Sequence, residues 1–188
     1  LNTKLVHGVR WNPASNNLLD QFFRLVERTT SNLVDVWITN SEVSRTTLEK
    51  RCNISNKRIH TIYNGIKLEK GKAPKLYERP MEVLTVAHLS PRKGHLEYLK
   101  IIKIVVQSFP ECKFVFLGRD NMKGEFQQAI EDQKLNKQVI YMGFESDVSR
   151  WLSRARLFVL PSLWVEGCPT SILEAFSFGI PQGSKIYG

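Results

Sequence analysis

Two glutamates and the start of a helix lie close together late in the sequence, and their types and spacing suit the binding of a phosphorylated sugar. Glu166 follows the apolar run 157–162, and Glu174 lies a little over one turn into the helix that Pro169 is expected to open. The unpaired N–H groups of residues 170–172 would face the loop with the positive end of the helix dipole, which favours phosphate. Carboxylates accept hydrogen bonds from paired sugar hydroxyls. This stretch therefore predicts a grip on a sugar nucleotide.

The elements around these residues follow from local sequence rules. The run 157–162, LFVLPS, is almost unbroken in apolar residues, which indicates a strand buried on both faces of a parallel sheet. Pro169 is placed at the first helical position, where its fixed φ costs no hydrogen bond, and Gly179 followed by Pro181 ends the helix. The apolar residues predicted to share one side of this helix are Ile172, Leu173, Ala175 and Phe176.

A plainer interpretation fits the same residues. A strand, a loop and a helix with two glutamates occur in many α/β proteins, and Glu174 could be a solvated helix residue. Cys168 beside the helix start could be a reactive thiol, but a small packing residue is the better interpretation.

Composition narrows the class of protein. The 188 residues are 42% hydrophobic and 24% charged, as in ordinary globular proteins. The net charge of +9 fits nucleic acid, an anionic membrane surface or anionic small substrates. No aromatic–basic alternation of the kind RNA binders use is present, so we expect no nucleic-acid partner. Lys100 and Lys103 could reach a peripheral anionic membrane, although a solvated helix face is the favoured interpretation.

Cysteine usage and hydropathy bear on the compartment. The three cysteines, Cys52, Cys112 and Cys168, are scattered and show no metal-ligand spacing, which favours a reducing compartment without disulfides. No run of about 18 apolar residues is present to span a membrane. We therefore expect a cytoplasmic protein, at most in contact with the inner membrane surface. The chain has no initiator Met and starts close to an apolar segment, so we expect truncation at both ends.

The order of elements predicts a doubly wound α/β fold with parallel, Rossmann-like sheets. Residues 1–66 are expected to be the remnant of an incomplete N-terminal domain, 67–80 a charged linker, and 81–188 a second domain. A strand after the helix at 170 should follow in such a domain, but PQGSKIYG is a poor candidate because Gly183 and Ser184 interrupt it. The expected strands are 4–7, 36–39, 59–63, 82–89, 113–117, 139–142 and 157–161, with a turn at Gly8 after the first of them. The expected helices of the first domain are about 17–33, with apolar residues at helical spacing, and one capped by Ser41.

The expected helices of the second domain are 94–109, 124–133 and 147–154. Helix 94–109 is nearly apolar all round, so we expect it to be well buried.

Four landmarks in this order resemble the retaining glycosyltransferases of family four, which have the GT-B fold. They are WITNSE with IYNGI (37–42 and 62–66), VAHLSPRKGH (86–95), FVFLG with VIYMGFESDV (114–118 and 139–148), and the Glu-x7-Glu element EGCPTSILE, preceded by LFVLPS and followed by EAFSFGIP. Each is weak alone, but together they cover nearly the whole chain. The resemblance implies two facing Rossmann-like domains with the donor held mostly on the second.

The resemblance also implies roles for individual residues. Glu166 would bind hydroxyls of the donor sugar, Glu174 would accept hydrogen bonds from the ribose, and Lys93 would neutralise the diphosphate. Phe144 would lie against the base, and His7 would contact the transferred sugar. The loop and helix start expected to line the phosphates are Gly167, Cys168, Pro169, Thr170 and Ser171. Taken without the landmarks, Lys93 reads as a solvated residue and His7 as a core histidine.

One departure from the family concerns the second landmark. Where the family has Gly-Arg, this chain has Ala87-His88, and a neutral His does not replace a fixed cation in binding diphosphate. Either His88 is protonated against the phosphates, or another basic residue such as Arg92 or Arg119 compensates, or catalysis is impaired. Compensation is the favoured alternative.

The activity implied is transfer of a hexose from a UDP-, GDP- or ADP-sugar to a glycan or lipid-linked acceptor, with retention of configuration. No Asp-x-Asp motif stands near the donor loop, so we expect no cofactor and no metal. The alternative is a fragment that binds nucleotide sugar without turnover.

Overall fold

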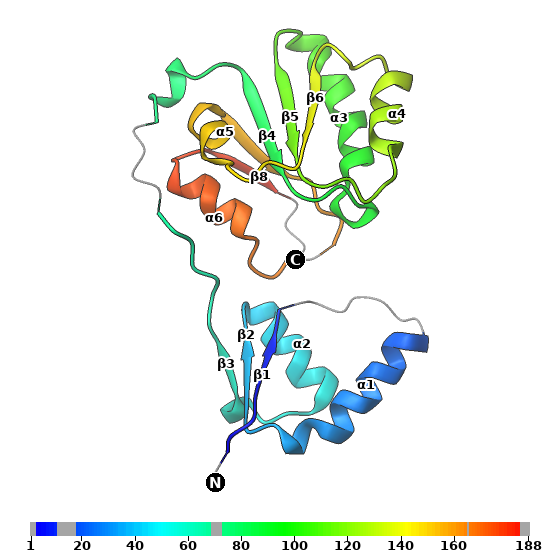
Figure 1. Cartoon of the computed structure of the whole chain (residues 1–188), viewed down its shortest axis with the longest axis vertical. Helices are drawn as coiled ribbons and strands as arrows, with labels where there is room; N and C mark the ends of the chain where they lie inside the picture. Colours follow the sequence, from blue (N-terminus) through cyan, green and yellow to red (C-terminus); the bar gives the residue numbers. More distant parts are fainter. Residues whose placement is uncertain (1–2, 11–17, 69–72, 165, 185–188) are drawn as a thin grey trace. The chain divides into compact units, whose positions relative to one another are not determined.

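The computed structural model describes residues 3–10, 18–68, 73–164 and 166–184, and the helix residue Asn17 expected from the sequence lies outside them. The chain forms two compact units (Figure 1). The first consists of residues 1–65 and 165–169, and the second of residues 66–164 and 170–188.

The first unit contains a three-stranded parallel sheet in the order β1-β2-β3. Trp37, 1% exposed, lies at the centre of a small core and pairs in register with His7 and Ile59 on its two neighbouring strands. The Ser41 hydroxyl accepts a hydrogen bond from the Ser44 N–H at 3.1 Å, so it caps α2 as the sequence predicts. The elements are β1 Val6–Val9, α1 Leu18–Thr30, β2 Val36–Thr39, α2 Glu42–Cys52 and β3 Ile59–Thr61, with 3-10 turns at Ser31–Leu33 and Asn56–Arg58.

The second unit is a doubly wound domain built on a five-stranded sheet, in the order β6-β5-β4-β7-β8. All paired strands run parallel, which confirms the Rossmann-like α/β class. Its elements are β4 Glu82–Val86, α3 His95–Ser108, β5 Lys113–Leu117, α4 Glu125–Asp132, β6 Val139–Gly143, α5 Ser149–Arg154, β7 Leu157–Leu160, α6 Thr170–Ser177 and β8 Gln182–Ser184, with 3-10 turns at Leu76–Glu78 and Pro91–Lys93.

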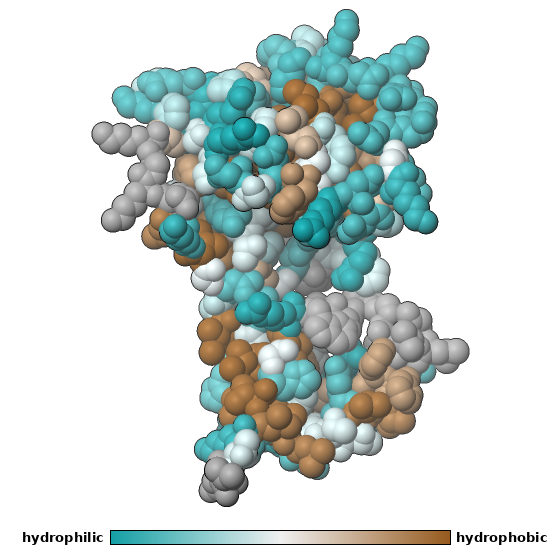
Figure 2. Space-filling model, viewed as in Figure 1, coloured by the Kyte–Doolittle hydropathy of each residue, from teal (hydrophilic) through white to brown (hydrophobic). Residues whose placement is uncertain are grey.

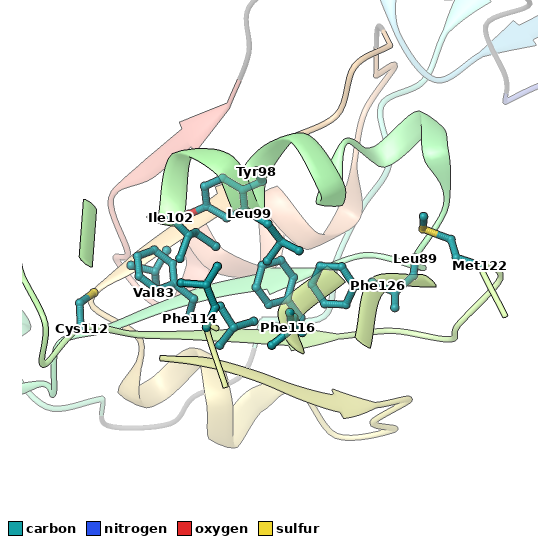
Figure 3. Packing of buried hydrophobic residues seen from close by; sticks show 13 residues of the cluster. Val83, Leu89, Tyr98, Leu99, Ile102, Cys112, Phe114, Phe116, Met122 and Phe126 are labelled. Carbon is teal, nitrogen blue, oxygen red and sulfur yellow. The ribbon is translucent and has the colours of Figure 1, made fainter. Parts of the chain in front are cut away.

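Both faces of this sheet are buried, as the continuous apolar runs predict. Alternate residues of one strand point to opposite faces, so Phe114 and Phe116 pack under α3 and α4, whereas Val115 and Leu117 pack under α5 and α6. Figure 3 shows the first of these layers, in which the ring of Phe116 meets that of Phe126 at 4.8 Å. This core fixes the strand ends that carry the candidate site.

The surfaces differ from the sequence expectation in two places. Ile101 and Ile104 of α3 are 55% and 66% exposed, so that helix is not buried all round, although its apolar composition predicted burial. On the first unit, Phe22 and Leu25 of α1 are each 60% exposed, and Figure 2 shows hydrophobic surface over this unit.

Two local predictions are corrected by the backbone. Gly8 continues β1 instead of turning, so His7 is the second residue of that strand and not its last. The residues 182–184 form β8, paired in parallel with β7, although Gly183 and Ser184 make a poor strand by composition. The backbone hydrogen bonds to β7 stabilise this strand, although its side chains have low strand propensity.

Residues 73–80, which the sequence places in the linker, pack on the second unit. Ala73 lies against the core layer under α5 and α6. Arg79 is 5% exposed and donates to the carbonyl oxygens of Pro74, Ala155 and Phe178 at 2.9–3.0 Å. This part of the chain is therefore fixed to the domain.

Candidate functional site

The strand order creates a natural binding edge in the second unit. β4 and β7 are neighbours, but the chain continues from β4 to β5 on one side and from β7 to β8 on the other. Loops leaving the carboxyl ends of such a strand pair diverge, and ligands of open α/β sheets bind in the crevice they leave. The loop after β4 carries His88, Arg92 and Lys93, and the loop after β7 leads to Glu166.

These two loops are held against each other within the second unit. The Leu163 N–H donates to the carbonyl oxygen of Arg92 at 2.9 Å. Gly94 has φ +68°, and a Cβ there would lie 2.2 Å from the carbonyl oxygen of Pro161, so only glycine fits. The Arg92 guanidinium lies over the Trp164 ring, 4.6 Å from its centroid. The structure thus brings the cationic segment 92–93 to the start of the loop that contains Glu166.

His88 lies at the carboxyl end of β4, where its side chain is exposed and bonded to the neighbouring loop. The backbone N–H of Arg119 donates to His88 Nδ1 at 3.2 Å. In this hydrogen bond Nδ1 is the acceptor, so the imidazole uses one of its two ring nitrogens to hold the loop after β5. The family's arginine is thus replaced here by a side chain that contacts the neighbouring backbone.

The side chain of Arg119 is directed towards β6. Its guanidinium lies 4.8 Å from the centroid of the Phe144 ring, which is 58% exposed. Because β5 and β6 lie on the side of β4 opposite to β7, this cation is placed away from the crevice between β4 and β7. Of the two candidates for compensation, Arg92 lies at that crevice and Arg119 does not.

The helix after the loop begins at Thr170, one residue later than predicted, with Pro169 immediately before it. Its first N–H groups, on Thr170 and Ser171, have no carbonyl one turn earlier within the helix to bond. Gly179, at φ +64°, follows the end of α6, and the Ile180 N–H bonds the Ala175 carbonyl oxygen at 3.2 Å.

Glu174 and the apolar face of α6 differ in part from the expectation. Ala175 is buried and Ile172 packs on the core, whereas Phe176 is 62% exposed. Glu174 is half-buried, and burial raises the pKa of its carboxyl above the ordinary value. No donor among the described residues bonds its carboxylate. Because burial removes part of the water around this carboxylate, hydrogen bonds from the hydroxyls of a ligand would stabilise it. This agrees with the predicted contact to the ribose.

The remaining predicted residues belong to the first unit. His7 stacks on Trp37 with ring centroids 4.6 Å apart, while its other surface is exposed. In the segment 165–169 of this unit, the Asn64 side-chain amide donates to the Cys168 carbonyl oxygen at 2.6 Å. A Cβ on Gly167 would lie 3.1 Å from the Asn40 side-chain oxygen. The predicted roles of Glu166, Gly167 and Cys168 stay predictions.

Some residues of the site were not found from the sequence. Trp164 belongs to no motif in the sequence, and its relevance to the site comes from the contact of its ring with Arg92. The anchoring of Arg119 could have been suspected from Gly118, since a glycine at the end of a buried strand often marks close backbone approach. A Cβ there would lie 2.0 Å from the Ala87 carbonyl oxygen.

In the described part of the chain, no group of three or more His, Cys, Asp or Glu side chains is placed to hold a metal ion. No helix there is long and apolar enough to cross a membrane. The three cysteines all lie in the described ranges and are free thiols, two of them buried.

Two family models match the sequence of this chain. The family model described as "Glycosyl transferases group 1" matches residues 67–182, and that of "Glycosyltransferase Family 4" matches residues 2–70. The chain belongs to glycosyltransferase family 4. The first of these models covers the whole sheet of the second unit up to β8, including the loops that carry Lys93 and Glu166.

Individual relatives are glycosyltransferases of bacteria and archaea. The family 4 chain is 23% identical to an uncharacterized glycosyltransferase of Methanocaldococcus jannaschii, over 96% of its length and 47% of the relative's. It is 31% identical to the UDP-Gal:alpha-D-GlcNAc-diphosphoundecaprenol alpha-1,3-galactosyltransferase of Escherichia coli, over 70% of its length and 38% of the relative's. The chain therefore spans less than half the length of these relatives.

Solved structures show the same fold. S. aureus TarM, in a variant bound to Fondaparinux, alpha-GlcNAc-glycerol and UDP, matches with a TM-score of 0.81 and 20% identity, over 97% of this chain and 37% of TarM. Anabaena HepE in complex with UDP and glucose matches with a TM-score of 0.80 and 22% identity, over 96% of this chain and 52% of HepE. These glycosyltransferases establish the GT-B fold for the family 4 chain.

Proposed function

We propose that this family 4 glycosyltransferase transfers a hexose from a nucleotide sugar to a glycan or lipid-linked acceptor, with retention of configuration. The observation that carries the proposal is the contact between the loops after β4 and β7, where the Leu163 N–H meets the Arg92 carbonyl oxygen at 2.9 Å. This contact fixes a cationic segment beside residues 161–164, from which the chain leads on to the first glutamate of the Glu-x7-Glu element. Such a crevice at the carboxyl edge is where open α/β sheets bind nucleotides.

The donor contacts follow from the chemistry of the residues. Lys93 and Arg92 neutralise the diphosphate, and the N–H groups at the start of α6, on Thr170 and Ser171, bond its oxygens. Glu174 accepts hydrogen bonds from the ribose hydroxyls, and Glu166 from the sugar.

Charge on the leaving diphosphate grows as the sugar departs. Cations and N–H dipoles already fixed beside it therefore stabilise the transition state more than the bound donor, which raises the rate of transfer. No carboxylate is assigned as a nucleophile. The leaving phosphate accepts the proton of the acceptor hydroxyl on the same face of the sugar, which retains its configuration. This neutralisation requires no metal, His7 contacts the transferred sugar, and Phe144 lies against the base.

Names of relatives support the choice of substrates. The E. coli relative is named for transfer from UDP-Gal to a diphosphoundecaprenol-linked sugar, and TarM and HepE were solved with UDP. A UDP-sugar donor and a lipid-linked acceptor are therefore the first pair to test. Cytoplasmic location and contact with an anionic membrane stay predictions.

The test is a transfer assay on the 188-residue chain with labelled UDP-, GDP- and ADP-sugars and lipid-diphosphate-linked acceptors. Lys93→Ala is expected to lower the rate of transfer by two orders of magnitude or more, roughly the loss of one preorganised charge contact. Lys103→Ala, an exposed lysine on α3, is the matched control and is expected to keep the activity.

The products separate the alternatives. A product with the opposite anomeric configuration, read by NMR, would reject the retaining mechanism. Donor binding without transfer or hydrolysis would show that the chain is a nucleotide-sugar-binding fragment. Absence of donor binding would reject the proposed site.

A further inference from the structure

Arg119 of the second unit has no role in the proposed phosphate chemistry. Arg119 stands at the carboxyl end of β5, with its guanidinium 4.8 Å from the Phe144 ring centroid. Both side chains are exposed. The stability of the fold does not require an exposed cation to lie over an exposed ring. The contacts of the surrounding backbone therefore show whether this pair is mobile on the surface or held in one position.

The backbone at Arg119 is fixed from several directions. Its N–H bonds His88 Nδ1 at 3.2 Å, and its carbonyl oxygen accepts from the Leu89 N–H at 2.9 Å. The preceding Gly118 donates to the Gly143 carbonyl oxygen at 2.8 Å and accepts from the Tyr141 hydroxyl at 2.9 Å. Residues at the carboxyl ends of the adjacent strands β4 and β6 therefore fix the backbone of residues 118–119, which follow β5.

We infer that Arg119, resting on Phe144, is a specificity-determining residue that selects the base of the nucleotide donor. The inference rests on the proposed function and extends it to a choice of base. Bases stack on aromatic and guanidinium planes with roughly 1–3 kcal/mol per base. The Arg119–Phe144 pair offers such a surface at the carboxyl ends of β5 and β6, on the side of β4 away from β7 and separate from the proposed phosphate crevice.

The hydrogen-bonding edge of arginine decides which bases fit. A guanidinium has five N–H donors and no acceptor, so it pairs with base edges that present acceptors. Uracil presents carbonyl oxygens, and guanine presents O6 beside N7, whereas adenine places an amino group beside N7. That amino group would meet a donor-only cation. Arg119 thus favours UDP- or GDP-linked sugars over ADP-linked ones.

Binding of UDP, GDP and ADP to the 188-residue chain, measured by calorimetry, tests this. The unaltered chain is expected to bind UDP or GDP about tenfold more tightly than ADP. Arg119→Ala is expected to weaken the preferred nucleotide about tenfold, as for the loss of one charged hydrogen bond, and ADP less than about twofold. Arg119→Lys, which lacks the planar fork, is expected to restore little of the preference. Lys100→Ala removes one exposed charge from α3 and should change nothing.

The outcomes distinguish this inference from the proposed function. If Arg119→Ala weakens all three nucleotides equally, Arg119 contributes to phosphate binding and base selection is overturned, while the donor site stands. Equal binding of all three by the unaltered chain, or no effect of Arg119→Ala, overturns it in the same way. If the unaltered chain binds no nucleoside diphosphate, both this inference and the proposed donor site fail.

Discussion

Gly118 lies so close to Ala87 that a Cβ on the glycine would be 2.0 Å from the alanine carbonyl oxygen. Its φ of +150° is also one that other residues rarely adopt. This contact joins the carboxyl ends of β4 and β5, where His88 and Arg119 begin their loops. The two strands cannot be brought to this spacing with a side chain between them.

Gly118→Ala should therefore be strongly destabilising. We expect it to lower the free energy of unfolding by more than about 3 kcal/mol, because strain and a backbone clash add. Gly124→Ala is the matched control, since Gly124 has φ +88° but open space around its Cβ position, and should cost about 1 kcal/mol. Urea unfolding followed by circular dichroism measures both. If both variants lost the same free energy of unfolding, a small shift of the backbone would be relieving the clash at Gly118→Ala.

His88→Arg tests whether the missing family arginine leaves a charge deficit. The His88 ring accepts a hydrogen bond from the Arg119 N–H, and an arginine in its place adds a fixed cation at the end of β4. We expect UDP to bind about three- to tenfold more tightly, the gain of one charge-assisted hydrogen bond. His88→Asn, which keeps a hydrogen-bond acceptor and adds no charge, is the control. No gain in affinity would show that Arg92 and Lys93 already suffice.

Much of the second unit could be predicted because its strands are continuous apolar runs between turn signals. Lys113–Leu117 was predicted to the residue, and the helix ends within one or two positions. β8 was undervalued because Gly183 and Ser184 have low strand propensity, and its pairing with β7 is a property of the sheet. The exposure of Ile101 likewise depends on which neighbours cover α3, and spacing along the helix does not state that.

Some residues of the candidate site could likewise be predicted from the sequence, and others could not. The sequence indicated Glu174 through its position within a helix, and Lys93 through the resemblance of its landmark to the family. It left Arg92 and Arg119 as equal candidates for compensation, because both follow a strand end. Only the strand order separates them, since it places β5 beside β6 and β4 beside β7. Contacts between loops distant in sequence, such as Arg92 with Trp164, arise from that order.

His95 makes stability depend on pH. It is 1% exposed, and burial, with the nearby charge of Lys93, lowers the pKa of His95 to about 4. The unfolded chain takes up the proton near pH 6.5, whereas the folded chain stays neutral until about pH 4. The free energy of unfolding should therefore fall as pH decreases between these values, by about 3 kcal/mol in total.

His95→Leu should remove this dependence while keeping the packing against Phe116 and Phe126. Urea unfolding at pH 7, 6, 5 and 4 gives the slope for each chain, and other groups that titrate contribute equally to both. A parallel fall in the two chains would show that His95 is not the responsible group.

Arg79 should be one of the most important residues for the stability of the second unit. Its buried guanidinium satisfies the carbonyl oxygens of Pro74, Ala155 and Phe178, and so ties residues 73–80 to the domain. Burial lowers the pKa of Arg79, and the three carbonyl oxygens replace the water that the charged group loses. Arg79→Met removes the donor from the buried bonds to Ala155 and Phe178 and from the part-buried bond to Pro74, and should lower the free energy of unfolding by about 3 kcal/mol or more.

Arg79→Lys separates charge from geometry. A lysine keeps the charge, but its ammonium is a compact group that does not reproduce the fork, so we expect a loss of about 2 kcal/mol. Arg154→Met is the matched control, because Arg154 pairs with Glu82 at the surface with half of its side chain exposed, and should cost less than about 1 kcal/mol. Urea unfolding at pH 7 ranks the three variants. If Arg79→Met were no worse than Arg154→Met, water would be replacing the guanidinium, and residues 73–80 would not be tied to the domain by Arg79.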